Sequence, residues 1–391
     1  MNQMTAPYRI RILKADPQIA ELRDFWNACG SCRDADLDFF LFIVGIYRAE
    51  RPHVVVLYEG ESPKALLAAR LETGHVPVRL GYLALPVPTL RILQVVHGGW
   101  LGDIDAVTSK LLIGSILESL ANGEADAASL HCPDIHSPLV QAATALPYRW
   151  CADHCIDPQA RRVRDLSGAP GSFVASLSQN ERYQQRKRAR HLAEAFADIR
   201  IACFSAAADI DALVRDAEII AAKSYQRGLN VGFSDTPIVR ARLGFEAGKG
   251  WMRGYILYLD GRPCAFWIGS LRDQVFLSEY LCFDSAYAKY APGMYLILKV
   301  IEGLNDGQSG DPVRLIDFGI GDTSYKERLA NRHWQESAVY IFAPKPKAVW
   351  VNALRSCVGV LNRSAKDVLR WTPWLAGVKR TWRARAAQSE R

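Results

Sequence analysis

Two segments roughly two hundred residues apart carry the same strand–turn–strand pattern. This internal repeat is the sequence feature that constrains the fold most strongly. Residues 53–72 (HVVVLYEGESPKALLAARLE) and 253–273 (RGYILYLDGRPCAFWIGSLRD) each hold an apolar strand, an acidic residue with Gly in a turn, Pro, and a second apolar strand. Internal repetition of this kind indicates one supersecondary unit used twice. We therefore predict an α+β unit duplicated within the chain. Two unrelated hairpins are the alternative, because hairpins are common.

Apolar spacing predicts the elements around these hairpins. Alternation and short buried runs predict strands at 8–14, 129–134, 199–204, 275–283, 313–319 and 336–344. Spacing of three and four predicts helices at 17–28, 107–121, 172–195, 207–226 and 293–306. The two halves thus share one order of strands and helices.

Length and composition place the chain among ordinary globular proteins. The 391 residues suggest two or three domains, and 49% hydrophobic with 23% charged residues argues against disorder or a coiled coil. The nine cysteines are scattered and odd in number, so we expect no disulfide framework. The first residues lack the apolar core of a secretory signal, and the longest apolar run, residues 39–47, is too short to span a bilayer. We expect a cytoplasmic location.

The net charge of +7 is concentrated in the C-terminal tail. Residues 345–391 hold eleven Lys or Arg and two acids, a net charge of +9, so the preceding residues sum to −2. A protein that coats nucleic acid is therefore not expected. The tail also holds Trp350, Trp371, Trp374 and Trp382. Tryptophan among basic residues suits an anionic membrane surface or a protein partner, and packing of a helix on the rest of the chain is the alternative.

Residues 275–303 (VFLSEYLCFDSAYAKYAPGMYLILKVIEG) join a hydrophobic strand to a long helix through Ala291, Pro292 and Gly293. The start of a helix exposes free N–H groups and the positive end of its dipole, which suits a pyrophosphate. Lys289 adds a charge nearby. An ordinary turn and helix start is the alternative interpretation.

This segment, the following Ile-Asp-Phe-Gly-x-Gly-Asp-x-x-Tyr-Lys string and the upstream 173–190 stretch together resemble the acetyltransferase domain of the GNAT superfamily. The chain is similar in particular to the CelD/BcsL-like subgroup, which is associated with bacterial cellulose and exopolysaccharide biosynthesis and is related to the Fem-type aminoacyltransferases. The resemblance extends over about 165–345. It implies tandem GNAT-like units with mixed, largely antiparallel sheets flanked by helices. The expected ranges are 1–160, 161–345 and a helical basic tail, 346–391.

The resemblance also implies an acyl-CoA donor, acetyl-CoA or another acyl-CoA, whose pantetheine arm lies between two parting central strands. The pyrophosphate would then lie on the loop formed by Lys289, Tyr290, Ala291, Pro292, Gly293 and Met294. This loop departs from the family pattern, because Pro and Met replace residues that are usually small. A looser CoA site or another acyl carrier therefore stays open.

The string from Asp317 to Lys326 (DFGIGDTSYK) combines acidic, phenolic and cationic side chains. A carboxylate can orient or deprotonate an acceptor, a phenol can protonate a leaving thiolate, and a cation can stabilise an oxyanion. The catalytic candidates here are Asp317, Asp322, Tyr325 and Lys326. A Gly-rich loop whose Asp side chains form turns is the alternative.

Glu279 lies on the apolar strand 275–283, and period-two alternation places it on one face with Leu277 and Leu281. A carboxylate on a buried strand needs a reason, because burying it without a partner is costly. It is a candidate general base, and a structural ion pair with an arginine is the alternative.

Five basic residues without an acid occupy residues 182–190 (RYQQRKRAR), and the resemblance makes Arg182, Tyr183 and Arg186 candidate acceptor-binding residues. Phosphate or polyanionic glycan contact is one interpretation, and a solvated helix face is the other. The histidines and cysteines show no metal-ligand spacing, so we expect no metal.

The resemblance implies an acyl-CoA-dependent N- or O-acyltransferase that transfers the acyl group, with acetyl favoured, directly to a small amine or hydroxyl acceptor, and the subgroup alone favours a saccharide. A Fem-like enzyme that uses aminoacyl-tRNA and a non-catalytic protein that binds a glycan or a partner are the alternatives. Nucleic acid is not an expected partner. Peripheral attachment to the inner membrane through residues 346–391 remains a further expectation.

Overall fold

The computed structural model describes residues 8–371 except 31, 48, 82, 170, 225–226, 228–231, 308–311 and 322, with side chains described to residue 364. The chain divides into two compact units, Met1–Pro158 with Gln335–Arg391, and Gln159–Trp334. Residues 335–345 therefore belong with the N-terminal unit, whereas the sequence analysis grouped them with the C-terminal range. The reason is that β15 (Val339–Phe342) pairs with β7 (Ala127–Leu130).

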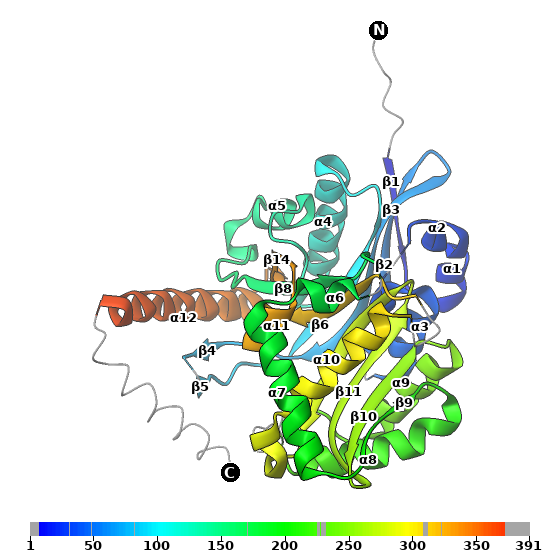
Figure 1. The fold of residues 1–391 in the computed structure, drawn as a ribbon. Helices are drawn as coiled ribbons and strands as arrows, with labels where there is room; N and C mark the ends of the chain where they lie inside the picture. Colours follow the sequence, from blue (N-terminus) through cyan, green and yellow to red (C-terminus); the bar gives the residue numbers. More distant parts are fainter. Residues whose placement is uncertain are drawn as a thin grey trace. The chain divides into compact units, whose positions relative to one another are not determined.

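The N-terminal unit is built on a six-stranded sheet in the order β1-β2-β3-β6-β7-β15. Figure 1 labels β1, β2, β3 and β6 of this sheet. The other strands of the unit are β1 (Tyr8–Leu13), β2 (Ala49–Glu59), β3 (Ser62–Gly74) and β6 (Leu90–Gly102), and a separate small hairpin is formed by β4 (Arg79–Leu80) and β5 (Leu83–Ala84). Its α-helices are α1 (Asp16–Ala20), α2 (Arg23–Ala28), α3 (Leu37–Ile46), α4 (Ala106–Ala121), α5 (Pro138–Thr144) and α12 (Pro346–Trp371).

The C-terminal unit is built on a seven-stranded sheet in the order β14-β8-β13-β12-β11-β10-β9. The strands are β8 (Gln159–Asp165), β9 (Ile199–Phe204), β10 (Met252–Leu259), β11 (Arg262–Arg272), β12 (Val275–Phe283), β13 (Leu315–Ile320) and β14 (Arg332–Glu336). The α-helices are α6 (Ser172–Ser176), α7 (Gln179–Ala195), α8 (Ile210–Ala222), α9 (Pro237–Gly248), α10 (Pro292–Asn305) and α11 (Ser324–Leu329).

The predicted duplication is confirmed by the sheet register. The β2–β3 hairpin shifts register between Leu57 and Tyr58, and the β10–β11 hairpin shifts register between Leu257 and Tyr258. A bulge at the same place in both hairpins gives each the same local twist. Residues 53–72 and 253–273 therefore resemble each other in structure as well as in sequence.

The same topology continues after each hairpin. In the N-terminal unit β3 pairs antiparallel with β6, α4 follows, and β7 returns parallel to β6. In the C-terminal unit β11 pairs antiparallel with β12, α10 follows, and β13 returns parallel to β12. An antiparallel strand, β15 or β8, then extends each sheet. The fold is thus a tandem α+β arrangement, as the sequence predicted.

Both faces of each sheet are buried. In β2, Val55 and Leu57 belong to one apolar cluster, whereas Val54 and Val56 belong to another. In β10, Leu257 and Ile256 likewise belong to two different apolar clusters. Helices must therefore cover both faces, which explains why these strands read as continuous apolar runs.

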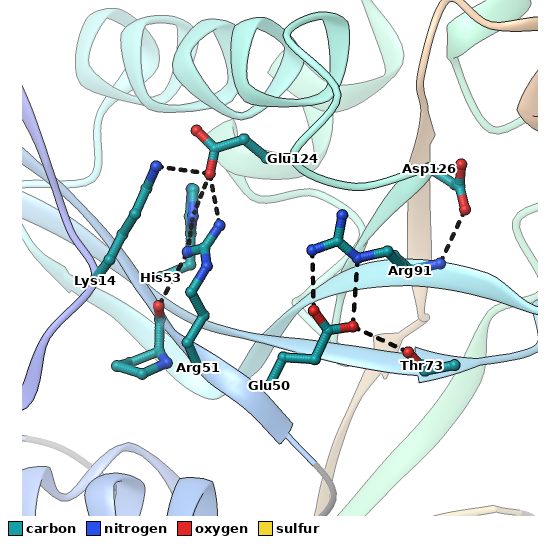
Figure 2. A network of polar contacts seen from close by, with 9 residues as sticks. Lys14, Glu50, Arg51, His53, Thr73, Arg91, Glu124 and Asp126 are labelled. Carbon is teal, nitrogen blue, oxygen red and sulfur yellow. Dashed lines mark hydrogen bonds and ion pairs between the residues drawn. The ribbon is translucent and has the colours of Figure 1, made fainter.

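A polar network that includes Arg51 and His53 of β2 lies in the N-terminal unit (Figure 2). The Glu124 carboxylate accepts from Lys14 Nζ at 2.8 Å and from Arg51 Nη2 at 2.7 Å, and His53 Nδ1 lies 3.6 Å from it. His53 is fully buried, and burial lowers its pKa from 6.5 to about 4. The imidazole is therefore neutral in the folded protein at neutral pH.

The C-terminal helix α12 is described as far as Trp371, and the rest of the basic tail lies outside the described residues. Within residues 8–371, apart from the gaps given above, no helix combines the length and the apolar content needed to cross a membrane.

Candidate functional site

The central strands of the C-terminal unit separate at one end of the sheet. β12 pairs with β13 in parallel over Val275–Leu277 and Leu315–Asp317, and the register given for these strands extends no further. At this point the β13–β8 register shifts between Asp317 and Ile320, so β13 is bent as well. The pairing between the two strands thus ends at Leu277, six residues before the end of β12. This geometry can admit an extended ligand between strands, as the resemblance implied.

Glu279 lies at a β-bulge on β12. Ile268 pairs with Tyr280 and Gly269 with Ser278, so Glu279 is the extra residue of β12. The bulge interrupts the alternation that the sequence analysis assumed, so a simple period of two does not hold from Glu279 to Leu281. Bulges re-aim side chains and are frequent beside active sites.

The Glu279 carboxylate forms an ion pair with Arg242 of α9, with Oε2 2.9 Å from Nη2. Both side chains are mostly buried, with 11% and 12% of their surface exposed. The Arg242 guanidinium also lies over the Tyr280 ring, 5.5 Å from its centroid. The structural alternative for Glu279 is thus present, and it holds the carboxylate beside the parting strands.

The helix α10 begins without a side-chain cap. Ala291 precedes it with a left-handed φ of 50°, Pro292 occupies the first turn, and no side chain accepts a hydrogen bond from the helix start. Pro292 has no N–H to satisfy, so the orphan donors of the first turn are the amides of the residues that follow it. These amides and the positive end of the helix dipole suit an anionic group.

The six predicted donor-loop residues lie together at this helix start. Lys289 is exposed, with Nζ 4.7 Å from the Tyr290 ring centroid, and Tyr290 packs edge-on against Phe196 at 5.0 Å. Gly293 is buried, and a Cβ there would lie 3.3 Å from Phe283 Cδ1. Met294 packs against the core of the unit. Gly293 is therefore required for close packing of α10 on β12.

The equivalent helix of the N-terminal unit is closed to an anion. α4 follows β6 as α10 follows β12, but its N-cap residue Asp105 accepts from the amides of Val107 and Thr108 at 2.7 and 2.8 Å. Thr108 completes a capping box by accepting from the Asp105 amide. A carboxylate thus occupies the donors that α10 leaves available, so only the C-terminal unit retains this feature.

Asp317 is engaged in a buried ion pair. Its Oδ2 accepts from Arg161 Nε at 2.8 Å and from Arg161 Nη2, and its Oδ1 accepts from the Gly319 amide at 2.7 Å. Arg161 lies on the neighbouring strand β8, and both residues are 8% exposed. The carboxylate therefore joins β8 to the bent end of β13. Nothing in the spacing of the sequence pointed to Arg161 as its partner.

Tyr325 and Lys326 follow on α11, near the same end of β13. Tyr325 lies edge-on to Phe318, 6.2 Å between ring centroids, and Lys326 Nζ donates to the Ile320 carbonyl at 2.8 Å. Burial lowers the pKa of Lys326, whereas the nearby Asp317 carboxylate opposes that change. The structure thus brings three of the four predicted residues of this string together. Asp322 lies outside the described residues.

The predicted acceptor-binding residues lie on α7. Arg182 Nη1 donates to the Ala175 carbonyl at 2.9 Å, Tyr183 is 55% exposed, and Arg186 is exposed. No described contact joins these three side chains to the 317–326 string. The link between α7 and α11 is instead made by Glu181, which accepts from Arg328 at 3.0 Å.

Arg242 was missed by the sequence analysis because it belongs to no motif. It lies four residues before Glu246 on α9, with Nε 3.9 Å from Oε1. This spacing is the only sequence signal that would have singled out the helix face, and it does not identify Glu279 as a partner. Among the residues whose side chains are described, no group of three or more His, Cys, Asp and Glu is arranged to hold a metal ion.

Comparison with known families gives a match over this unit. Residues 179–327 match the model described as an acetyltransferase (GNAT) domain. The C-terminal unit therefore carries a GNAT acetyltransferase domain. The match spans less than half of the chain and includes β12, the start of α10 and the 317–326 string. The match supports an acetyltransferase-type domain in this unit, and it identifies neither the acyl donor nor the acceptor. A comparison with curated proteins finds no match.

Solved structures resemble the chain over both units. FemX is 9% identical with a TM-score of 0.55, and the match covers 88% of this chain and 100% of that one. L-PGS from Bacillus licheniformis (11% identity, TM-score 0.48, 90% and 98% covered) and a tandem GNAT protein from the clavulanic acid biosynthesis pathway (13%, 0.47, 86% and 99%) are also similar. At 9% identity the FemX match supports the tandem fold alone.

Proposed function

We propose that this protein transfers an acyl group, acetyl in the simplest case, from an acyl-CoA to an amine or hydroxyl of a saccharide or another small acceptor. The observation that carries the proposal is the separation of β12 from β13 beside the uncapped start of α10. This feature lies inside the range that matches the GNAT domain. The contrast with α4, whose first amides bind Asp105, supports the C-terminal unit as the donor-binding unit.

The residues of the α10 start fit the pyrophosphate of the donor. The amides of Gly293 and Met294 and the helix dipole provide neutral hydrogen-bond donors, and the exposed Lys289 ammonium provides a charge. The other loop residues, Tyr290, Ala291 and Pro292, set the course of the chain into the helix. The pantetheine arm would then extend along the edge of β12 that β13 leaves.

An acyl-CoA supplies a thioester, whose carbonyl carbon the acceptor amine or hydroxyl attacks, so that the C–S bond breaks and CoA leaves as the thiol. The acceptor must lose a proton, and Glu279 at the bulge is our candidate base, positioned by Arg242. Tyr325 is the candidate proton donor to the leaving thiolate. We assign Asp317 a positioning role, because both of its carboxylate oxygens are engaged, one by Arg161 and the other by the Gly319 amide.

Lys326 and the α7 residues complete the proposal. A lysine whose pKa is lowered by burial beside Asp317 can stabilise the oxyanion or orient the acceptor. Arg182, Tyr183 and Arg186 would contact an anionic acceptor. A polysaccharide pathway of the CelD/BcsL-like kind is the setting that the sequence resemblance favours.

Calorimetric titration of the full chain with acetyl-CoA and with CoA tests the proposal. Lys289→Glu reverses an exposed charge at the proposed pyrophosphate site, and the expected result is an affinity about tenfold weaker, or about 1.4 kcal/mol. Lys299→Glu makes the same charge change two turns further along α10, where Lys299 pairs with Glu302 at 2.8 Å. This control should leave the affinity unchanged.

Saturable binding that only Lys289→Glu weakens would support the donor site. Absence of binding by either ligand would overturn the acyl-CoA proposal. A tRNA affinity that falls steeply with salt would then favour the Fem-like alternative. If the protein binds neither the CoA ligands nor tRNA, a glycan- or partner-binding protein would be favoured.

A further inference from the structure

The C-terminal helix α12 packs on the N-terminal unit through the apolar side chains of Ala348 and Val351 and through several polar side chains. Arg355 forms a buried ion pair with Asp153, and Asn352 Nδ2 donates to the carbonyls of Trp150 and Ala152 at 2.9 and 2.8 Å. Further along, Asn362 Nδ2 donates to the Arg79 carbonyl at 2.6 Å. These contacts fix which face of the helix is buried. They anchor it to the segment 149–153 and to the β4–β5 hairpin.

The opposite face of α12 is apolar and exposed. Trp350, Val360 and Leu361 are 53%, 54% and 56% exposed, and Ala353 and Cys357 on the same face are exposed too. We call these five residues the apolar strip. Between residues 350 and 362 the face holds no charge. Because α12 also buries Ala348, Val351 and Val358, the apolar strip is a second apolar face of the helix, one that stays exposed.

Both segments that anchor α12 add exposed apolar side chains. Leu80 and Leu83 of the β4–β5 hairpin are 43% and 63% exposed, and Tyr148 and Trp150 are stacked at 5.2 Å and about half exposed. Figure 1 shows α12 and the hairpin extending from the same side of the unit. An exposed apolar surface of this extent on a globular protein marks an interaction site.

The charges around the apolar strip indicate what covers it. Arg79, Arg149 and Arg363 are exposed beside these apolar residues. In the sequence, residues 364–391 add seven Lys or Arg against two acids. A second copy of the chain would bring two segments of the same strong positive charge together, which is unfavourable. An anionic lipid surface satisfies both the apolar and the basic groups.

We propose that α12 and the β4–β5 hairpin form a docking surface for an anionic phospholipid bilayer, with the apolar strip entering the boundary between headgroups and acyl chains. This inference does not rest on the acyltransferase proposal, since it uses other residues and another unit. It predicts a peripheral protein whose attachment needs apolar contact as well as charge. The basic groups attract the protein to the anionic surface from a distance, and the apolar strip inserts below the headgroups.

Co-sedimentation of the full chain with vesicles tests this surface. Vesicles of phosphatidylcholine with about one-third phosphatidylglycerol should bind the protein, and pure phosphatidylcholine should bind it at least about tenfold more weakly. Val360→Gln together with Leu361→Gln keeps the charge and the helix propensity while removing apolar surface, and should weaken binding about tenfold or more. Ile219→Gln with Ile238→Gln removes similarly exposed side chains from α8 and α9 and should change nothing.

Two results would overturn the proposal. The first is wild-type binding that the α12 double variant does not change, which would mean attraction by basic residues alone. The second is absence of vesicle binding by the wild-type protein. If sedimentation velocity then shows a dimer that the double variant disrupts, the strip is an interface between two copies of the chain. Circular dichroism of the double variant, expected to match the wild type, shows that any loss of binding is not a loss of fold.

Discussion

Removal of the Asp317 carboxylate should cost the C-terminal unit a large part of its stability. The carboxylate accepts from Arg161 and from the Gly319 amide, and both side chains of the ion pair are about nine-tenths buried. Asp317→Ala leaves the guanidinium in that environment without its carboxylate, a change that typically costs about 3–5 kcal/mol. For a unit of this size the loss lowers the melting temperature by about 6–20 °C.

Thermal unfolding followed by circular dichroism measures this effect. Glu327→Ala is the matched control, because Glu327 is 70% exposed and its nearest contact to Arg162 is 3.8 Å. It should change the free energy of unfolding by less than about 0.5 kcal/mol. Replacing both Arg161 and Asp317 by leucine should recover much of the loss, since the buried charge is removed with its partner. An Asp317→Ala protein with wild-type stability but no acyl transfer would refute this reasoning and make Asp317 catalytic.

Three further outcomes follow from other contacts. Gly269→Ala should destabilise the C-terminal unit by about 1–3 kcal/mol in urea unfolding, because a Cβ there would lie 2.2 Å from the Leu277 carbonyl oxygen. Gly248→Ala is the control and should be neutral, because a Cβ at that position would meet open space. Because the pKa of His53 falls from 6.5 to about 4 on folding, the unfolded chain binds the proton first, so the free energy of unfolding should fall as pH drops from 6.5 to 4. His53→Gln should show a shallower fall over that interval, and an unchanged slope would contradict the burial argument. Asp105→Ala should destabilise α4 by about 1 kcal/mol in the same urea assay, without creating a second CoA site detectable by calorimetry.

The duplicated hairpins could be predicted from sequence because the pattern is local. Strand, turn and strand are adjacent in the chain, so residues 53–72 and 253–273 display the repeat directly. The junction at residues 289–294 was predictable for the same reason, since Pro and Gly mark a helix start within a few residues. These segments lie as expected, with α10 beginning at Pro292.

The partners of the candidate site residues could not be predicted, because they come from distant segments. Arg161 and Asp317 meet only through the β8–β13 pairing, and Arg242 reaches Glu279 from a helix thirty-seven residues earlier. The bulge at Glu279 depends on how β11 and β12 align, which alternation alone does not reveal. The place of β15 in the N-terminal sheet was hidden in the same way, since its partner β7 lies more than two hundred residues before it.

The most direct test of the central claim is amide hydrogen exchange of the full chain with and without CoA. The account predicts protection of two peptides, 276–283 on β12 and 291–296 at the start of α10, with no change at the start of α4, residues 105–109. The peptides around Lys299 serve as the internal reference for α10. Protection at the α4 start, or no protection at either predicted peptide under saturating CoA, would contradict the account.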